Sequence, residues 1–388
     1  MMDISRRQAL SFLGSTSLFA AWPQLAASKT NTPILILVEL QGANDGLNTY
    51  VPYQDPNYFK LRPKIALRKE HILTVTETMG FHFSLENLAN HFERGECQII
   101  QNLGYPNPIL SHFRSIELWE RGGDGKRNFG DGWIVKTLDQ LAMANNWDAK
   151  AICLDNESGL FTGGLDGYLG PNAIGYVPAA QESRDATIPV MEENNAVGLL
   201  GELIEGRRAS QDQILTIRRK LDENRQHFSF GRGDLGRQLS QVCTLIGAGL
   251  ELPVYKVSIG SFDTHINQYW NHRDLLRQLD ESLDNTVSAL KRIGVWDNTI
   301  IMTYSEFGRR ASENGSRGTD HGMAAPHLML GGRLKGGFIG SNPNLMMLDN
   351  NNLTFNIDYR ALYDHVLSTH FGATDNPFAK YRDSVFTA

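Results

Sequence analysis

Cysteine is scarce in this sequence, whose 388 residues include only Cys97, Cys153 and Cys243. The three lie too far apart for a CxxC metal knuckle, and so few cysteines cannot build a disulfide framework. Their spacing predicts small buried side chains and leaves a single disulfide open. A chain of this length can bury an adequate apolar core without metal or disulfide cross-links.

An excess of positive charge is also absent. Lys and Arg number 37 against 43 Asp and Glu, so the formal net charge is −6. Such a chain has no overall attraction to nucleic acid or anionic lipid, and we expect no nucleic-acid partner. Charged residues at 21% and aromatic residues at 9% are too balanced for a disordered chain.

The sequence lacks an apolar run that could form a stable membrane span, which needs about 20 residues. The N-terminal apolar stretch lies within 11–27 and is interrupted by glycine, serine and proline. Arg6 and Arg7 precede it, so 1–30 is predicted to be an export signal and linker, cut after Ala27. The paired arginines resemble a twin-arginine signal. They predict a periplasmic or extracellular protein that uses the twin-arginine export machinery.

Three common catalytic motifs are missing: GxSxG, GxxxxGK[ST] and HExxH. Their absence removes the usual routes to a serine esterase, a nucleoside triphosphatase or a zincin. What remains is a metal site at strand ends, or no site.

Short apolar segments alternate with amphipathic ones after the export signal. Strands are predicted at 33–40, 97–105, 252–263 and 299–305, with helices starting after Ser111 and spanning 269–292. This alternation predicts an α/β fold with a mostly parallel sheet and helices on both faces, giving three layers. We expect one domain over 31–388, in which the glycine-rich and charged segment 151–250 is an insertion or cap.

Histidine and carboxylate side chains collect after the predicted strands. The histidines of interest are His112, His265, His321 and His327, and two of them stand near carboxylates, as Asp263 does near His265 and Asp320 next to His321. Imidazole and carboxylate groups bind zinc, manganese and related cations. In a mostly parallel sheet these side chains meet at the carboxyl edge, so they indicate a metal site there.

The segments GANDGLNTYVP, LSHFRS, DTHINQ, SEFGR, GTDHG and LGGRLKGG together resemble a bacterial family of unknown function. That family is exported by the twin-arginine route and related to sulfatases, within the alkaline phosphatase superfamily. The resemblance covers nearly the whole mature chain. It implies an alkaline phosphatase-like fold with one or two divalent metals, which we expect to be zinc, calcium, magnesium or manganese.

The same resemblance implies roles for individual residues. It places Asp45, Asp320 and His321 around one metal, and Asp263, His265 and His327 around a second. It assigns the nucleophile to Ser111 at a helix start, where free N–H groups favour an anion. It also makes Arg114 and Arg309 candidates to clamp an oxyanion.

The sequence departs from the superfamily pattern at two points. Asp263 and His265 are two residues apart, so on a strand they would face opposite sides, and the chain must turn there if both are ligands. Glu306 stands directly after the strand at 299–305, where an Asp-His pair is usual, and is therefore a rival metal ligand.

The resemblance implies an exported metal-dependent hydrolase of phosphate or sulfate esters, acting on a small anionic ester substrate. The alternative is a secreted binding or assembly protein that keeps the fold, and perhaps a structural metal, without turnover. Hydrolysis that depends on Ser111 distinguishes the two.

Overall fold

A computed structural model describes residues 32–124, 130–142, 145–155, 159–164, 166–170, 213–224, 226–231 and 233–386. The predicted export signal at 1–30 lies outside the described residues. Within them, no helix combines the length and apolar character needed to cross a membrane.

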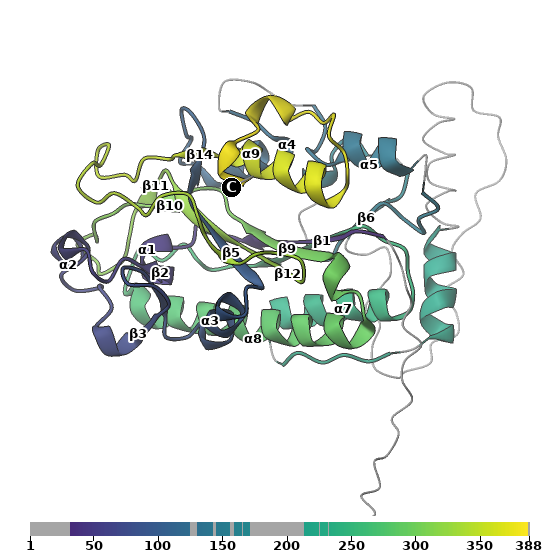
Figure 1. Ribbon diagram of the computed structural model, residues 1–388, viewed down its shortest axis with the longest axis horizontal. Helices are drawn as coiled ribbons and strands as arrows, with labels where there is room; N and C mark the ends of the chain where they lie inside the picture. The colour runs from purple at the N-terminus through teal and green to yellow at the C-terminus, as the bar shows by residue number, and fades with distance from the viewer. Residues whose placement is uncertain are drawn as a thin grey trace, which may run out of the picture.

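A nine-stranded sheet forms the centre of the molecule (Figure 1). Eight strands lie in the order β13-β5-β12-β9-β1-β8-β6-β7, and β14 also pairs with β5. Every pairing is parallel except those of β12, which runs antiparallel to β5 and β9. The strands are β1 (Ile34–Leu40), β5 (Cys97–Gly104), β6 (Ala151–Cys153), β7 (Tyr168–Leu169), β8 (Val254–Ile259), β9 (Thr299–Tyr304), β12 (Ala325–Gly331), β13 (Gly337–Ile339) and β14 (Ile357–Asp358).

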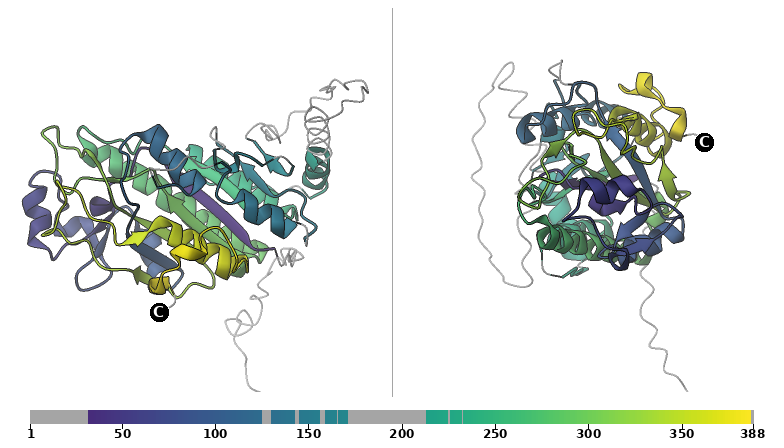
Figure 2. Two further views of the ribbon diagram at one scale, coloured as in Figure 1. Left: turned by 90° about the horizontal axis from the view of Figure 1, so that it is seen from above. Right: turned by 90° about the vertical axis from the view of Figure 1, so that its left-hand side faces the viewer.

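The sheet is covered on both faces because its central strand is apolar on both sides. All seven residues of β1 are buried, and they alternate between two core clusters. Ile36 and Val38 belong to the core beneath α3 (Glu86–Glu93), α7 (Asp234–Gly247) and α8 (Gln268–Ile293). Leu35 and Leu37 belong to the opposite core, with α4 (His112–Arg121), α5 (Val135–Ala142) and α9 (Tyr359–His365). The predicted three-layer α/β fold is confirmed, and Figures 1 and 2 show its helices on either side of the strands.

Smaller elements extend the fold beyond the central sheet. They are the helices α1 (Gly46–Thr49) and α2 (Pro56–Leu61), the three-stranded sheet of β2 (Tyr50–Val51), β3 (Ile72–Thr74) and β4 (Gly80–His82), and the pair β10 (Gly308–Arg309) and β11 (His321–Gly322). In Figure 1, α1, β10 and β11 lie toward the left-hand end of the sheet.

The described parts of the predicted insertion at 151–250 include framework elements. β6 pairs with β8, β7 forms the sheet edge beside β6, and α7 packs against α8 and β8. The stretch 171–212 lies outside the described residues, and an insertion there stays a prediction.

Four framework histidines, of which three are buried and His370 is half-buried, stay uncharged at neutral pH. Burial lowers the pKa of His82 and His327 to about 3, and the pKa of His272 and His370 to about 4. The unfolded chain binds a proton at each ring below about pH 6.5. Because the folded pKa values lie lower, the free energy of unfolding falls as pH drops from about 6.5 toward 4.

His327 on β12 tests this dependence. Its side chain is 1% exposed, its ring packs edge-on against Trp119 with centroids 5.3 Å apart, and neither ring nitrogen has a hydrogen-bond partner in the described structure. His327→Leu should therefore leave stability at pH 7 unchanged or higher. Between about pH 5.5 and 4 it should flatten the decline in unfolding free energy by about 1.4 kcal/mol per pH unit, measured by denaturant titration.

The matched control is His227→Leu, which replaces an exposed ring and should leave the pH dependence as it is. A His327→Leu protein whose stability falls with pH as steeply as that of the parent would contradict the neutral, buried state of His327.

Candidate metal centre

Loops that follow β1, β8 and β9 meet at one edge of the sheet, because these three strands are parallel neighbours. α4 starts at the same edge, since the carbonyl of Leu110 accepts a hydrogen bond from His321 Nδ1 at 3.0 Å. Gly42 makes the close packing possible. Its φ is +102°, and a Cβ there would stand 2.4 Å from the backbone nitrogen of Asp263.

Three imidazoles converge at this edge. The Nε2 atom of His321, on β11, lies 3.1 Å from Nε2 of His112, the first residue of α4. It also lies 3.1 Å from Nε2 of His265 in the loop after β8. Two ligands of a tetrahedral zinc ion, each about 2.0–2.1 Å from the metal, stand about 3.3 Å apart. The spacing of the nitrogen atoms is close to that value.

The opposite nitrogen of each ring faces an oxygen acceptor. Nδ1 of His112 lies 2.6 Å from Glu306 Oε1, Nδ1 of His321 bonds the Leu110 carbonyl, and Nδ1 of His265 lies 3.4 Å from Asp320 Oδ1. These acceptors favour the proton on Nδ1, which leaves a lone pair on each Nε2. Three lone pairs that face one another repel unless a cation lies between them. The arrangement therefore fits a divalent metal ion.

Asp263 adds a carboxylate to the same point. Its Oδ1 lies 2.9 Å from His265 Nε2 and 3.3 Å from His321 Nε2, and its Oδ2 lies 3.6 Å from His112 Nε2. One ligand atom from each of His112, Asp263 and His321 lies within 4.8 Å of the others, and the described residues contain no second group of this kind. His265 stands beside this group, with its Nε2 2.9 Å from Asp263 Oδ1 and 3.1 Å from His321 Nε2. The Asp263 side chain is 44% exposed, so solvent reaches the centre.

The pKa shifts favour the ionised form of both carboxylates at this centre. Burial raises the pKa of Asp263, but the hydrogen bond and charge of Arg309 outweigh it and hold that pKa below its usual value. Burial likewise opposes ionisation of Glu306, and hydrogen bonds, first that from His112, lower its pKa. The hydrogen bond to Glu306 raises the pKa of His112, whereas burial lowers that of His321.

A tight turn resolves the two-residue spacing of Asp263 and His265. β8 ends at Ile259, four residues before the predicted end at Asp263. Ser261 then has a positive φ of 76°, and the backbone N–H of His265 donates to the Asp263 carbonyl at 3.1 Å. The turn places both side chains on the same side of the chain.

Arg309 holds the loops together and has no donor nitrogen left for a substrate. Its side chain is inaccessible to solvent and donates to the carbonyls of Ala43 at 2.7 Å, Thr319 at 2.9 Å and Phe262 at 3.2 Å, and to Gly42. The same guanidinium bonds Asp263 Oδ1 at 2.5 Å. The structure thus makes Arg309 a positioning residue, in place of the predicted oxyanion clamp.

The structure places Asp45 in a neighbouring buried network. Its Oδ2 and Oδ1 accept hydrogen bonds from Arg62 at 2.6 and 2.9 Å, and Gln268 donates to Oδ2 at 2.5 Å. Both carboxylate oxygens are thereby engaged by protein groups. The predicted grouping of Asp45 with Asp320 and His321 is replaced by contacts in which Asp320 bonds Asn314 at 3.0 Å and faces His265.

Other predicted site residues fall into three groups. Glu306 is buried and orients His112, and it also accepts the backbone N–H of Gly42 at 2.8 Å. His327 lies in the core and not beside Asp263. Arg114 pairs with Glu117 along its own helix.

Ser111 does stand at the start of α4, as predicted. Its side chain is exposed and makes no capping hydrogen bond.

The sequence pattern assigns no role to two residues that the structure places at the centre. His112 directly follows the predicted nucleophile Ser111, and Arg310 follows Arg309. The Nε of Arg310 is buried without a hydrogen-bond partner among the described residues, and its charge, after the hydrogen bonds from Asn314 and His265, helps to lower the pKa of Asp320. The Arg-Arg pair after Gly308 was the available signal.

The profile of the family described as "Protein of unknown function (DUF1501)" matches residues 33–376. The chain therefore belongs to this family. No curated protein sequence matches the chain. The family match identifies relatives without supplying an activity.

Solved structures align with most of the chain at low identity. The zinc complex of the C-terminal periplasmic domain of EptC from Escherichia coli is 8% identical, with a TM-score of 0.38, over 78% of this chain and 74% of that one. A protein in the alkaline phosphatase superfamily from Vibrio parahaemolyticus is 12% identical, with a TM-score of 0.35, over 82% and 65%. The complex of Ps i-CgsB with k-i-k-neocarrahexaose is 12% identical, with a TM-score of 0.41, over 87% and 71%.

We expect one tightly bound divalent metal per chain. His112→Ala should weaken zinc affinity by at least about 100-fold, because it removes a converging lone pair. Glu306→Gln should weaken it about 10- to 100-fold, because it loosens the ring orientation of His112. Metal content after purification without chelator, followed by competition with a chromogenic chelator, gives these values. His327→Leu is the control with normal zinc content, and normal zinc affinity in His112→Ala would refute the centre.

Asp45→Ala tests the separate network. It leaves the buried Arg62 without its carboxylate, so the free energy of unfolding should fall by about 3–5 kcal/mol. Zinc affinity of the folded variant should stay within about threefold of the parent. Glu70→Gln, which breaks an exposed pair with Arg68, should leave stability unchanged. Loss of zinc by a folded Asp45→Ala protein would instead return Asp45 to the metal centre.

Proposed function

We propose that this DUF1501 protein is a divalent-metal-dependent hydrolase of phosphate or sulfate esters. The observation that carries the proposal is the convergence of His112, Asp263 and His321 at a solvent-accessible point, with His265 beside His321 and Asp263. A divalent cation held there would act as a Lewis acid and stabilise the negative charge that develops on ester oxygens. One such centre per chain, with His112, Asp263, His265 and His321 as ligands, is the expected stoichiometry.

Ser111 is the proposed nucleophile. Leu110, before it, accepts a hydrogen bond from His321, and His112, after it, is a ligand of the centre, so the serine is held between two residues of the site. Its exposed hydroxyl makes no capping bond and is free to attack an ester. The unpaired N–H groups in the first turn of α4 favour the anionic group of the substrate.

Arg310 is the proposed anion-binding side chain. Arg309 is fully engaged by protein acceptors and Arg114 pairs with Glu117. In the part of the chain that the structure describes, the buried Nε of Arg310 has no hydrogen-bond partner. A guanidinium binds two oxygens of a phosphate or sulfate group in a bidentate manner. Arg310 lies beside Asp320, at the rim of the metal centre, where such a group would bind.

Export to the periplasm or the extracellular space belongs to the same proposal. It rests on Arg6, Arg7 and the short apolar stretch that follows them. In the competing proposal the chain is a secreted binding or assembly protein with a structural metal, and the fold and the export signal are the same. The two proposals differ in whether the protein hydrolyses an ester.

Ser111→Ala tests the proposal. The zinc- or manganese-loaded protein should hydrolyse 4-nitrophenyl phosphate or 4-nitrophenyl sulfate, and dialysis against a chelator should abolish the activity. Ser111→Ala should lower kcat by about 1,000-fold or more while retaining the metal. Continuous measurement of 4-nitrophenol release gives kcat and KM.

Two variants serve as comparisons. Ser229→Ala changes an exposed serine outside the site and should keep full activity. Arg310→Gln should raise KM more than it lowers kcat. A protein that binds one metal equivalent but hydrolyses neither ester would support the non-catalytic function and overturn the hydrolase.

A further inference from the structure

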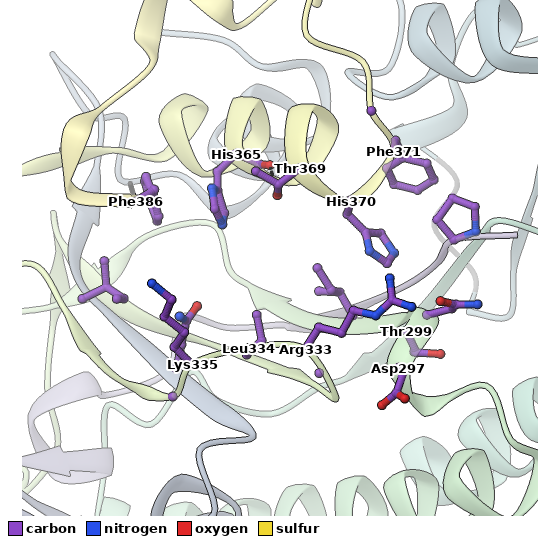
Figure 3. Close-up of a pocket in the computed structure, with 18 of the residues that line it drawn as sticks. Asp297, Thr299, Arg333, Leu334, Lys335, His365, Thr369, His370, Phe371 and Phe386 are labelled. Atoms are coloured by element: carbon purple, nitrogen blue, oxygen red, sulfur yellow. Dashed lines mark hydrogen bonds between the residues drawn. The ribbon is translucent and has the colours of Figure 1, made fainter. Parts of the chain in front are cut away.

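A cavity of about 780 Å³ lies at the opposite edge of the sheet from the metal centre (Figure 3). It is lined by Thr299 and Ile300 at the start of β9, whereas Glu306 of the metal centre follows the end of the same strand. Seven residues of extended chain separate the two places by roughly 20 Å. The cavity is therefore distinct from the metal centre, and its volume is that of a small-molecule site.

One wall of the cavity carries two cations. Arg333 and Lys335 lie in the turn between β12 and β13, on either side of Leu334. Within the part of the chain that the structure describes, neither side chain has a carboxylate within ion-pair distance. The acidic residue of the lining is Asp297, and Figure 3 shows its carboxylate directed away from the space between the walls. Two cations without acidic partners are notable in a protein of net charge −6.

The facing wall is flat and uncharged. It consists of residues from the end of α9 and from the π-helix η4 (Val366–His370), together with the C-terminal Phe386. The rings of His365 and Phe386 stack with centroids 4.9 Å apart and an interplanar angle of 18°. His370 donates from Nε2 to the carbonyl of Ile34 at 3.0 Å, which fixes the orientation of its ring.

Burial lowers the pKa of both His365 and His370, so neither ring adds charge at neutral pH. The positive charge of the cavity comes from the turn alone. In Figure 3 Lys335 faces the His365 and Phe386 side of the space, and Arg333 extends toward His370.

We propose that this cavity binds a small organic anion with a flat apolar body. Its oxyanion head, a carboxylate or a group of similar geometry, would bind the guanidinium of Arg333 on the His370 side of the cavity. Its body would extend toward the stacked rings of His365 and Phe386, beside Lys335. A guanidinium fits the planar fork of a carboxylate, and the aromatic pair supplies the contact area that holds a flat body. The site is independent of the metal centre and of its hydrolytic function.

Calorimetric titration of the metal-loaded full chain with 2-naphthoate tests the site. The parent should bind one equivalent with a submillimolar Kd. The double variant R333Q/K335Q should bind at least about 10-fold more weakly, because the guanidinium contact and the second positive charge of the cavity are lost. The matched control R68Q/K69Q removes the same two charges from exposed positions and should leave the Kd unchanged.

A second pair of measurements tests the apolar contact. F386A should weaken 2-naphthoate at least about 5-fold, whereas acetate, which has no body, should bind parent and F386A equally weakly. Circular dichroism confirms that each variant is folded, and R333Q alone replaces the double variant if the latter is not. Failure of the parent to bind 2-naphthoate, or equal Kd values for parent and R333Q/K335Q, would overturn the proposal. The proposal would also be overturned if His112→Ala lost 2-naphthoate binding while R333Q/K335Q kept the Kd of the parent, because that result would place the anion at the metal centre.

Discussion

The candidate site depends on one buried guanidinium. Arg309 bonds carbonyls in the loop after β1, in the loop after β8 and in the segment before β11, and it also binds Asp263. These segments are far apart in sequence, and an arginine with fewer acceptors in the interior would be strongly unfavourable. The need to satisfy its donors therefore fixes the relative position of three loops. The imidazoles on those loops acquire their spacing as a consequence.

A second buried arginine acts on the outer side of the same loops. Arg62 bonds Asp45 and also the carbonyls of Arg310 and Ala311, at 3.0 and 2.8 Å. It thereby fixes the backbone directly after Arg309 and holds Arg310, whose side chain is free of described hydrogen bonds, at the rim. Arg309 therefore positions the loop that carries Asp263, and Arg62 positions the backbone of Arg310 and Ala311. A carboxylate such as Asp45 is then a structural partner, although its position after β1 resembles that of a ligand.

The sequence predicted the framework better than the loops, for a physical reason. Apolar runs gave the positions of β1, β5, β8 and β9 to within a few residues, because strands buried on both faces are apolar throughout. The 3.6-residue period gave α8, because a helix buried on one face repeats its apolar residues at that spacing. The structure brings Asp263, His265 and His321 together, whereas the resemblance divided them between two metals. What periodicity cannot supply is the backbone path after a strand, such as the positive φ of Ser261 that turns Asp263 and His265 to one side.

The errors in the site follow from the same limit. His327 is a polar residue in a buried strand, and its alternation with apolar neighbours does not show whether its ring faces a metal or the indole of Trp119. A helix-start pattern identifies the capping position, here Ser111. It does not show whether the ring of the next residue, His112, faces the site. The two histidines differ in one contact. A metal-binding imidazole needs a hydrogen-bond acceptor for the ring nitrogen that faces away from the metal. His112 has Glu306, whereas neither nitrogen of His327 has a described partner. This criterion needs three-dimensional contacts, so it separates ligands from core histidines only once the chain is folded.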